Sequence, residues 1–335
     1  MASLLERQLI VVTGKGGTGK STVACALGLL AARRGLRTIV VELGDQRRLP
    51  ALFGQAHAPE SGEEVELQAG LWSTSIDPDK ALIEWLRTLG GRLSVRMLSA
   101  SSTFQYFAAA APGAKELVSM VKVRELCERT STREGATRGA PNGTSLHGSS
   151  NVRSYDLVVL DASATGHALA MLRSPRTFGT IVRVGPLAEQ AQGVHALLED
   201  PGRSAYVAVA HAAEMAVTET LELEQGLRRQ LDRDLDAVIV NGTMSRRFTR
   251  EELERVSPIS AGAQAQETQV VADARRMARS SYERARVQQN QIARLRRQRF
   301  AEGMAPSIVT IPLLFTSELD LDEVRKISAG LERKL

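Results

Sequence analysis

The apolar residues of the chain alternate between short aliphatic runs and longer helical patterns. Near-continuous runs of Val, Ile and Leu predict strands that are buried on both faces. These runs cover residues 8–13, 38–43, 155–162, 180–185, 204–210, 236–242 and 307–312. Helical patterns lie between most of them, which is typical of a parallel sheet with helices on both faces. We therefore predict one α/β domain over residues 1–335, a doubly wound and mostly parallel sheet with helical insertions, which binds ligands at the carboxyl ends of its strands.

Two stretches interrupt this alternation. Residues 131–154 are rich in Gly, Ser, Thr and Asn without an apolar period, which predicts a flexible surface loop. Residues 265–300 carry apolar side chains at helical spacing, with nine arginines between 275 and 299. We expect a long basic amphipathic helix. Such a helix suits nucleic acid, an anionic membrane surface or an acidic partner, or it covers the sheet and presents a solvated arginine face.

Composition narrows the function classes. The 335 residues are 43% hydrophobic and 24% charged, which fits a folded globular chain rather than a disordered one. Aromatic residues are only 4%, which argues against a protein that stacks single-stranded bases. The two cysteines, Cys25 and Cys127, are too few for a disulfide framework or a four-thiolate zinc site, and they fit a cytoplasmic setting. No apolar run approaches the roughly 20 residues of a membrane span.

The segment GKGGTGKS at 14–21 matches G-x-x-x-x-G-K-[ST] and lies between a predicted strand and a predicted helix. Its glycines allow backbone N–H groups to converge on phosphate oxygens, and the start of the helix adds a positive dipole end. We expect Lys20 to reach the β- and γ-phosphates of ATP and Ser21 to offer its hydroxyl to Mg²⁺. The predicted nucleotide-binding residues here are Gly14, Lys15, Gly16, Gly17, Thr18, Gly19, Lys20, Ser21 and Thr22.

Asp161 supplies the second predicted Mg²⁺ group. It ends the predicted strand YDLVVLD, where a carboxylate can hold the ion through water. Ser21 and Asp161 are therefore the predicted metal residues.

Two motifs resemble a known family. The segment KGGTGKST resembles the deviant Walker A of the MinD, ParA, nitrogenase iron protein and ArsA group, in which the extra lysine contacts nucleotide in a partner subunit. The segment DASATGH at 161–167 is similar to the switch II signature D-T-A-P-T-G-H of the ArsA and guided-entry ATPases, which handle tail-anchored proteins. The resemblance implies that Lys15 acts across a sandwich dimer and that Gly166 approaches the γ-phosphate. It also implies that Thr165 and His167 sense this phosphate or relay movement to the rest of the chain.

Further segments are similar to the bacterial ArsA-like branch in the same order along the chain, namely 109–126, 214–223 and 311–319. This resemblance implies that Asn241 recognises adenine. It also implies that Pro312 and Leu313 belong to the loop that closes over the base.

The region expected to position the attacking water departs from the family pattern. Relatives carry D-P-A-H after the second strand, whereas here VELGDQRR places Gly44 at the aspartate position. Asp45 stands one residue late and Glu42 two residues early, so either carboxylate positions the water or hydrolysis is slow. The predicted catalytic residues are Lys15, Lys20, Asp45 and Glu42.

The small number of cysteines limits which other properties of the related ATPases we expect in this chain. No Cys follows Cys127, so the zinc-binding C-x-x-C pair that clamps eukaryotic guided-entry dimers is absent from this sequence. Arsenite pumping through several thiolates is disfavoured for the same reason.

From the sequence we expect a Mg²⁺- and ATP-binding, ATP-hydrolysing dimer of the ArsA and guided-entry type. Its partner would be a second copy or a paralogous subunit, and its client protein is unknown. The alternative is a catalytically weakened regulatory or structural subunit beside an active paralogue. A positioning factor of the ParA or MinD kind would need the basic helix to bind DNA or lipid, and the T-G-H motif argues against it. Nucleic acid is disfavoured as a partner, and a peripheral membrane contact stays open.

Overall fold

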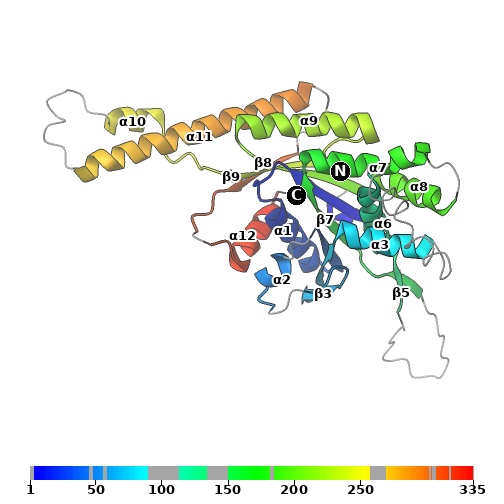
Figure 1. Cartoon of the computed structure of the whole chain (residues 1–335). Helices are drawn as coiled ribbons and strands as arrows, with labels where there is room; N and C mark the ends of the chain where they lie inside the picture. Colours follow the sequence, from blue (N-terminus) through cyan, green and yellow to red (C-terminus); the bar gives the residue numbers. More distant parts are fainter. Residues whose placement is uncertain are drawn as a thin grey trace, which may run out of the picture.

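A computed structural model describes residues 4–44, 48–55, 59–89, 113–133, 150–181, 185–256, 269–301, 303, 307–316 and 318–334. Its centre is a sheet in the order β10-β9-β8-β1-β7-β2-β4-β3 (Figure 1). The strands are β1 Leu9–Gly14, β2 Thr38–Leu43, β3 Val65–Gln68, β4 Leu71–Ile76, β7 Leu157–Ala164, β8 Ser204–His211, β9 Ala237–Thr243 and β10 Ile308–Pro312. Neighbouring strands run parallel except β3 against β4. The predicted doubly wound α/β fold is confirmed.

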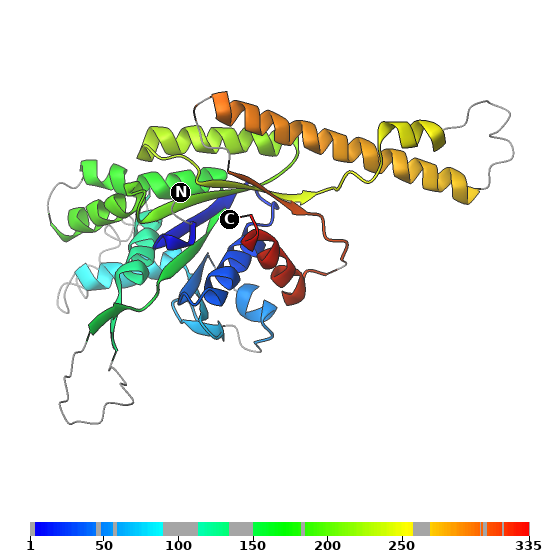
Figure 2. The same ribbon diagram turned by 180° about the vertical axis from the view of Figure 1, so that it is seen from behind.

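Helices cover both faces of this sheet because its central strands are apolar on both sides. In β1, Leu9 and Val11 face one hydrophobic cluster, and Ile10 and Val12 face the other. One face carries α1 (Lys20–Arg33), α2 (Arg48–Leu52) and α12 (Leu321–Glu332). The opposite face carries α3 (Pro78–Leu89), α6 (Ala114–Glu128), α7 (Thr165–Ile181), α8 (Pro186–Glu199) and α9 (Glu214–Leu231), as the two opposed views show (Figures 1 and 2). A short 3₁₀ turn, η1 (Leu4–Glu6), precedes β1.

The sequence of α1 explains its close packing on the sheet. Its residues from Val23 to Ala31 are all buried, so it is apolar nearly all round, as a helix pressed between a sheet and another helix must be. Gly28 allows this approach, because a Cβ at that position would lie 2.7 Å from Cγ2 of Val40. The helix therefore starts directly at the carboxyl edge of the sheet, below the glycine-rich loop.

The predicted strands agree with the structure at six of the seven runs. The strand predicted at 180–185 is wrong, because Thr180 and Ile181 end α7 and Gly185 precedes α8, while 182–184 lie outside the described residues. Local β-branched composition is overruled there by packing of α7 on the sheet. No apolar run predicts β3 or β4, because VELQ in β3 and the Ser- and Thr-rich LWSTSI in β4 both lack an aliphatic run.

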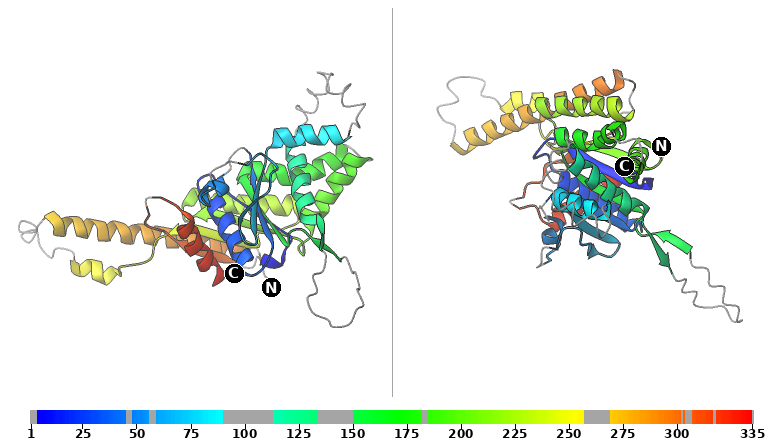
Figure 3. Two further views of the ribbon diagram at one scale, coloured as in Figure 1. Left: turned by 90° about the horizontal axis from the view of Figure 1, so that it is seen from below. Right: turned by 45° about the vertical axis from the view of Figure 1, so that its right-hand side comes forward.

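The two ends of the segment predicted as a flexible loop form a hairpin. Strands β5 (Thr130–Arg133) and β6 (Ser150–Arg153) pair antiparallel and project from the body (Figure 3). The prediction is wrong for these ends, because ladder hydrogen bonds order them despite the polar composition. Residues 134–149 lie outside the described part.

The predicted basic helix is found as α11 (Gln269–Ala301), which is continuous and preceded by α10 (Arg250–Val256). Residues 265–268 of the prediction lie outside the described residues. The carboxyl half of α11 lies along α9, and the other half extends with α10 well beyond the sheet (Figures 1 and 3). We call α10 together with residues 269–288 the arm. Among the described residues, no helix has the length and apolar character to span a bilayer.

Candidate nucleotide site

The glycine-rich loop connects the buried end of β1 to α1 and needs glycine at two crowded points. Gly14 has φ 145°, and a Cβ there would lie 2.1 Å from the carbonyl oxygen of Val209 on β8. Gly19 precedes α1 with φ 92°, and its Cβ would lie 2.5 Å from Nδ2 of Asn241. Any other residue would displace the loop from the sheet edge. The loop thus follows a fixed path over the start of α1.

Hydrogen bonds within the loop hold its shape. The Thr18 hydroxyl donates to the Lys15 carbonyl oxygen at 2.8 Å, and the Lys20 ammonium donates to the same oxygen at 3.2 Å. Burial lowers the pKa of Lys20, partly offset by the charge of Asp161. Lys20 therefore lies across the loop, where its charge would meet phosphate oxygens cradled by the backbone.

Two residues at the ends of neighbouring strands contact backbone carbonyl oxygens of the glycine-rich loop. Asn241, at the end of β9, donates its amide to the Thr18 carbonyl oxygen at 2.9 Å. The ring of His211, at the end of β8, places Nε2 3.2 Å from the Gly17 carbonyl oxygen and Nδ1 3.1 Å from that of Asn241. His211 is not among the residues that the sequence predicts for this site. Its position at the carboxyl end of a predicted strand was the available signal.

Ser21 and Asp161 meet at the first turn of α1. The Ser21 hydroxyl is hydrogen-bonded to the Asp161 carboxylate, which lies on β7 next to β1. Burial raises the pKa of Asp161, while Ser21, Lys20 and Arg48 oppose that rise. A hydroxyl and a half-buried carboxylate are hard oxygen donors of the kind that Mg²⁺ prefers. The pair therefore fits a Mg²⁺ site beside the phosphate loop.

Glu42 is buried and already has hydrogen-bond partners. Its side chain is 4% exposed, and its oxygens accept from the backbone N–H groups of Arg48 at 3.0 Å and Leu49 at 3.3 Å, at the start of α2. It stands opposite Asp161 in the β2–β7 register. Burial raises the pKa of Glu42 to about 7. The two backbone hydrogen bonds lower this pKa, and the charge of nearby Asp161 raises it further. Asp45, the other predicted water-positioning residue, lies outside the described residues.

The switch II residues lie at the start of α7. Thr165 begins the helix with a buried hydroxyl that has no partner among the described residues, and Gly166 and His167 follow on the exposed side. The Thr13 hydroxyl of β1 donates to the Ser163 carbonyl oxygen at 3.1 Å. This bond joins the strand that carries the phosphate loop to the strand that leads into the switch.

The residues expected near adenine lie on the two outermost strands at this side of the sheet. Pro312 pairs with Thr243 in the β9–β10 register, and Leu313 donates its N–H to the Thr243 carbonyl oxygen at 2.9 Å. Leu313 is 42% exposed, and the Asn241 amide reaches the phosphate loop from the same edge. The structure thus brings Asn241, Pro312 and Leu313 to the phosphate-loop edge of the sheet.

Lys15 points out of the loop. Its ammonium forms an ion pair with Glu219 on α9, and the two side chains are 35% and 31% exposed. Lys20 and Lys15 therefore take different directions from one loop, the first across the loop interior and the second toward the surface.

Both cysteines are buried and unpaired. Burial raises the pKa of each thiol to about 12, so both stay protonated near neutral pH. In the described part of the chain, no three His, Cys, Asp or Glu side chains gather as a metal cluster would require.

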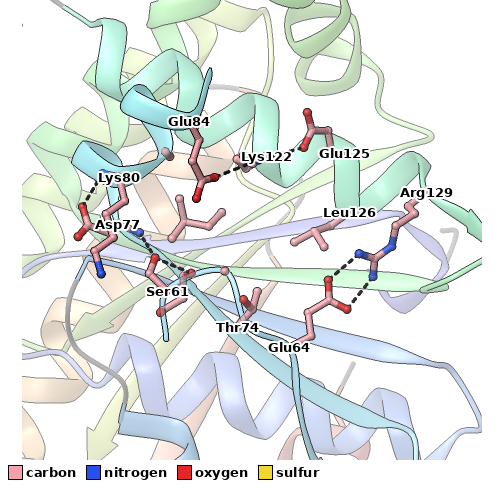
Figure 4. Close-up of a pocket in the computed structure, with 14 residues that line it drawn as sticks. Ser61, Glu64, Thr74, Asp77, Lys80, Glu84, Lys122, Glu125, Leu126 and Arg129 are labelled. Carbon is pink, nitrogen blue, oxygen red and sulfur yellow. Dashed lines mark hydrogen bonds and ion pairs between the residues drawn. The ribbon is translucent and has the colours of Figure 1, made fainter. Parts of the chain in front are cut away.

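A second cavity lies between β4, α3 and α6 and has a volume of about 350 Å³ (Figure 4). Its charged side chains pair with one another: Arg129 binds Glu64 through two bonds of 2.6 and 2.7 Å, and Lys122 lies 3.6 Å from Glu84. The sheet order places β2 and β7 between β4 and the β1 strand that carries the phosphate loop. The first pair connects the residue before β3 to the residue after α6, and the second connects α3 to α6.

The parallel sheet, the glycine-rich loop between β1 and α1, and Asp161 on the adjacent strand define a P-loop NTPase fold. A family model described as "Anion-transporting ATPase" matches residues 7–190, and the chain therefore belongs to the ArsA ATPase family.

Named relatives agree with this assignment. The chain is 27% identical over 256 residues to "ATPase BagA" of Mycobacterium tuberculosis, covering 75% of this chain and 69% of that protein. It is 28% identical over 181 residues to "ATPase ASNA1 homolog 1" of Paramecium tetraurelia, covering 52% of this chain and 46% of that protein. It is 26% identical over 171 residues to "ATPase GET3" of Paracoccidioides lutzii, covering 50% and 42%. The resemblance to ArsA and guided-entry ATPases is confirmed at the level of the family.

Proposed function

We propose that this chain binds Mg·ATP at residues 14–22, hydrolyses it, and works in the cytoplasm as a dimer that closes around nucleotide to act on a client protein. The observation that carries the proposal is the meeting of Lys20, Ser21 and Asp161 at the carboxyl edge of the sheet. These are the three groups that phosphoryl transfer needs from one subunit: a phosphate-binding cation, a metal-binding hydroxyl and a metal-binding carboxylate.

In this proposal each residue has a defined task. Lys20 compensates charge on the β- and γ-phosphates, and the backbone N–H groups of the loop orient them. Ser21 and Asp161 would hold Mg²⁺, which when bound neutralises charge on the phosphate oxygens. Asn241 faces adenine while it fastens the loop through Thr18. Pro312 and Leu313 flank the base.

In this proposal, Lys15 contributes to the closure of the two subunits around nucleotide. An ammonium that leaves the loop toward the surface can reach the nucleotide of a facing subunit, as the family resemblance implies. Binding of the γ-phosphate would then favour the closed dimer, and its loss would release it. Thr165, Gly166 and His167 stand where α7 begins and would transmit this change through α7.

A weakened regulatory or structural subunit is the second candidate. Two observations favour it: Gly44 replaces the family's aspartate, and the Glu42 carboxylate is engaged by the backbone of Arg48 and Leu49. If Asp45 does not position water, the subunit would bind ATP and depend on an active paralogue for turnover.

The test is to measure ATP binding by fluorescent-analogue titration and turnover by phosphate release, using the full chain with Mg²⁺. Sedimentation velocity with a non-hydrolysable ATP analogue then measures association. We expect saturable binding, turnover that requires Mg²⁺, and a nucleotide-dependent dimer. Binding without turnover would favour the regulatory subunit, and absence of binding would refute both candidates.

A further inference from the structure

Two adjoining cavities run along the arm. The inner one, about 420 Å³, and the outer one, about 840 Å³, share Met244, Arg284 and Leu313. We call the two together the arm groove. Its walls come from three segments that are distant in sequence: residues 242–248 at and after the end of β9, residues 274–288 of α11 and residues 313–315 after β10.

The groove begins beside the nucleotide site. Its inner end is at Gly242, the neighbour of Asn241, whose amide binds the phosphate loop. The Gln288 side chain fixes this end, because it accepts from the Met244 N–H at 2.7 Å and donates to the Gly242 carbonyl oxygen at 3.2 Å. The outer cavity is lined by residues 274–284 of α11. The amino-terminal half of α11 extends with α10 beyond the sheet (Figure 1). A protein that docks on the phosphate-loop edge of the sheet would therefore lie beside the arm.

The lining combines apolar and cationic groups. Met277 is 73% exposed and Phe315 is 76% exposed, which is unusual for such large apolar side chains gathered in one place. The Arg247 guanidinium lies 5.4 Å from the centre of the Phe315 ring. Arg284 and Arg276, which pairs with Asp273, add two further cations to the lining, against the one carboxylate of Glu283. The groove is complementary to a segment that carries both apolar and acidic side chains.

The chain itself carries a segment of that chemistry. Residues 318–322, ELDLD, hold three carboxylates, and Leu319 is 47% exposed. This segment cannot fold back into its own groove, because the Asp320 side chain caps α12 through the N–H groups of Asp322 and Glu323, and α12 packs on α1. It leads from β10 into α12 at the same edge of the sheet as the arm.

We propose that the arm groove receives residues 318–322 of a second copy of this chain when two subunits meet through their phosphate loops. This inference rests on the proposed nucleotide-dependent dimer. It names one surface that would hold the two subunits of that dimer together. A two-fold dimer would form the contact twice, with each arm against the partner's acidic segment. Opposite charges fix the register of such a contact.

The test reverses charge on one side of the contact. The double variant Arg247→Glu with Arg276→Glu is compared with Arg296→Glu with Arg297→Glu, a matched pair of exposed arginines on α11 outside the groove. Association of the full chain is measured by sedimentation velocity with a non-hydrolysable ATP analogue, and ATP affinity of each variant is measured separately. We expect about tenfold weaker association for the groove variant alone, with ATP affinity unchanged.

A charge exchange identifies the occupant. Adding Glu318→Arg and Asp322→Arg to the groove variant should restore association to within about threefold of the original chain. Loss without rescue would overturn residues 318–322 as the occupant.

Three other results would also count against the inference. Unchanged association of the groove variant, in a chain that does dimerise, would refute this contact and leave the proposed function standing. Binding of the arm to phosphatidylserine vesicles, lost in the groove variant while association persists, would assign the groove to a membrane surface instead. If the original chain binds ATP yet never associates, the proposed dimer itself fails and this contact with it.

Discussion

Lys15 of the phosphate loop forms an ion pair with Glu219 of α9, 204 positions away in the sequence. The next residue toward the amino terminus, Thr218, accepts a hydrogen bond from Arg294 of α11 at 3.1 Å. The loop, α9 and α11 are therefore connected through adjacent residues. A lysine held by its own subunit must leave Glu219 before it can reach a partner's nucleotide.

This relationship leads to the first prediction, which concerns association. Glu219→Gln should strengthen nucleotide-dependent association by about two- to fivefold, because the competing partner of Lys15 is gone and the pair is partly exposed. Lys15→Ala should abolish association while nucleotide affinity of the single subunit changes little. Sedimentation velocity with a non-hydrolysable analogue measures both, and Glu222→Gln on the exposed side of α9 is the control. Normal association of Lys15→Ala would mean that Lys15 is an ordinary surface residue.

The second prediction concerns nucleotide binding. Lys20→Ala should weaken ATP binding by about tenfold to a hundredfold, because a charge-assisted contact to phosphate is lost. The thermal stabilisation that Mg·ATP gives the original chain should fall accordingly. Titration and thermal melting check this against Lys80→Ala, an exposed lysine of α3. Equal ATP affinity in the two variants would contradict the assignment of the loop.

The third prediction concerns which carboxylate positions the attacking water. If Asp45 does so, Asp45→Asn should preserve ATP binding and lower turnover by about 10²-fold, the scale for loss of an acid–base group. If Glu42 does so, Glu42→Gln alone should have this effect, and its carboxylate would have to leave the N–H groups of Arg48 and Leu49. Phosphate release under saturating ATP distinguishes them. A measurable rate that neither substitution changes would show that both assignments are wrong.

The fourth prediction concerns stability against pH. Burial raises the pKa of Glu42 from 4.5 to about 7, so the folded state binds the proton more tightly than the unfolded state. This contribution to stability is fully present below pH 4.5 and is lost as the pH rises through about 7. The stability of Glu42→Gln relative to the original chain should therefore rise as the pH increases from 4.5 to about 7. Urea unfolding of both proteins at several pH values measures the difference, and a constant difference would contradict the raised pKa.

The fifth prediction concerns the attachment of α11 to the body. Arg299 and Glu224 are fully buried and joined by bonds of 2.9 and 3.0 Å, and Arg299 also donates to the Leu235 carbonyl oxygen at 2.8 Å. Arg299→Met would leave the Glu224 carboxylate buried without its cation, at a cost of about 3–5 kcal/mol. Urea unfolding should show this loss for Arg299→Met. Arg297→Met, on the exposed side of the same helix, should stay close to the original chain.

The sequence by itself determined the fold class, because aliphatic runs and helical periods are local patterns that only a layered α/β sheet can bury. It also located the phosphate loop, since 14–21 combines spacing, glycine content and position between strand and helix. The placement of Asp161 at a strand end predicted its proximity to that loop. These features are set by neighbours along the chain.

Tertiary structure decided the contacts between distant segments. Glu219 beside Lys15, and His211 beside Gly17, depend on which strands are neighbours in the sheet, and no local pattern encodes that order. The same holds for Glu42. Its position at the end of a predicted strand does not reveal that its carboxylate binds the backbone N–H groups at the start of α2. Thr180 and Ile181 at the start of the 180–185 run belong to α7, because their surroundings, not their β-branched side chains, fixed the backbone there. Long-range packing, which periodicity does not report, therefore set the partners of the site.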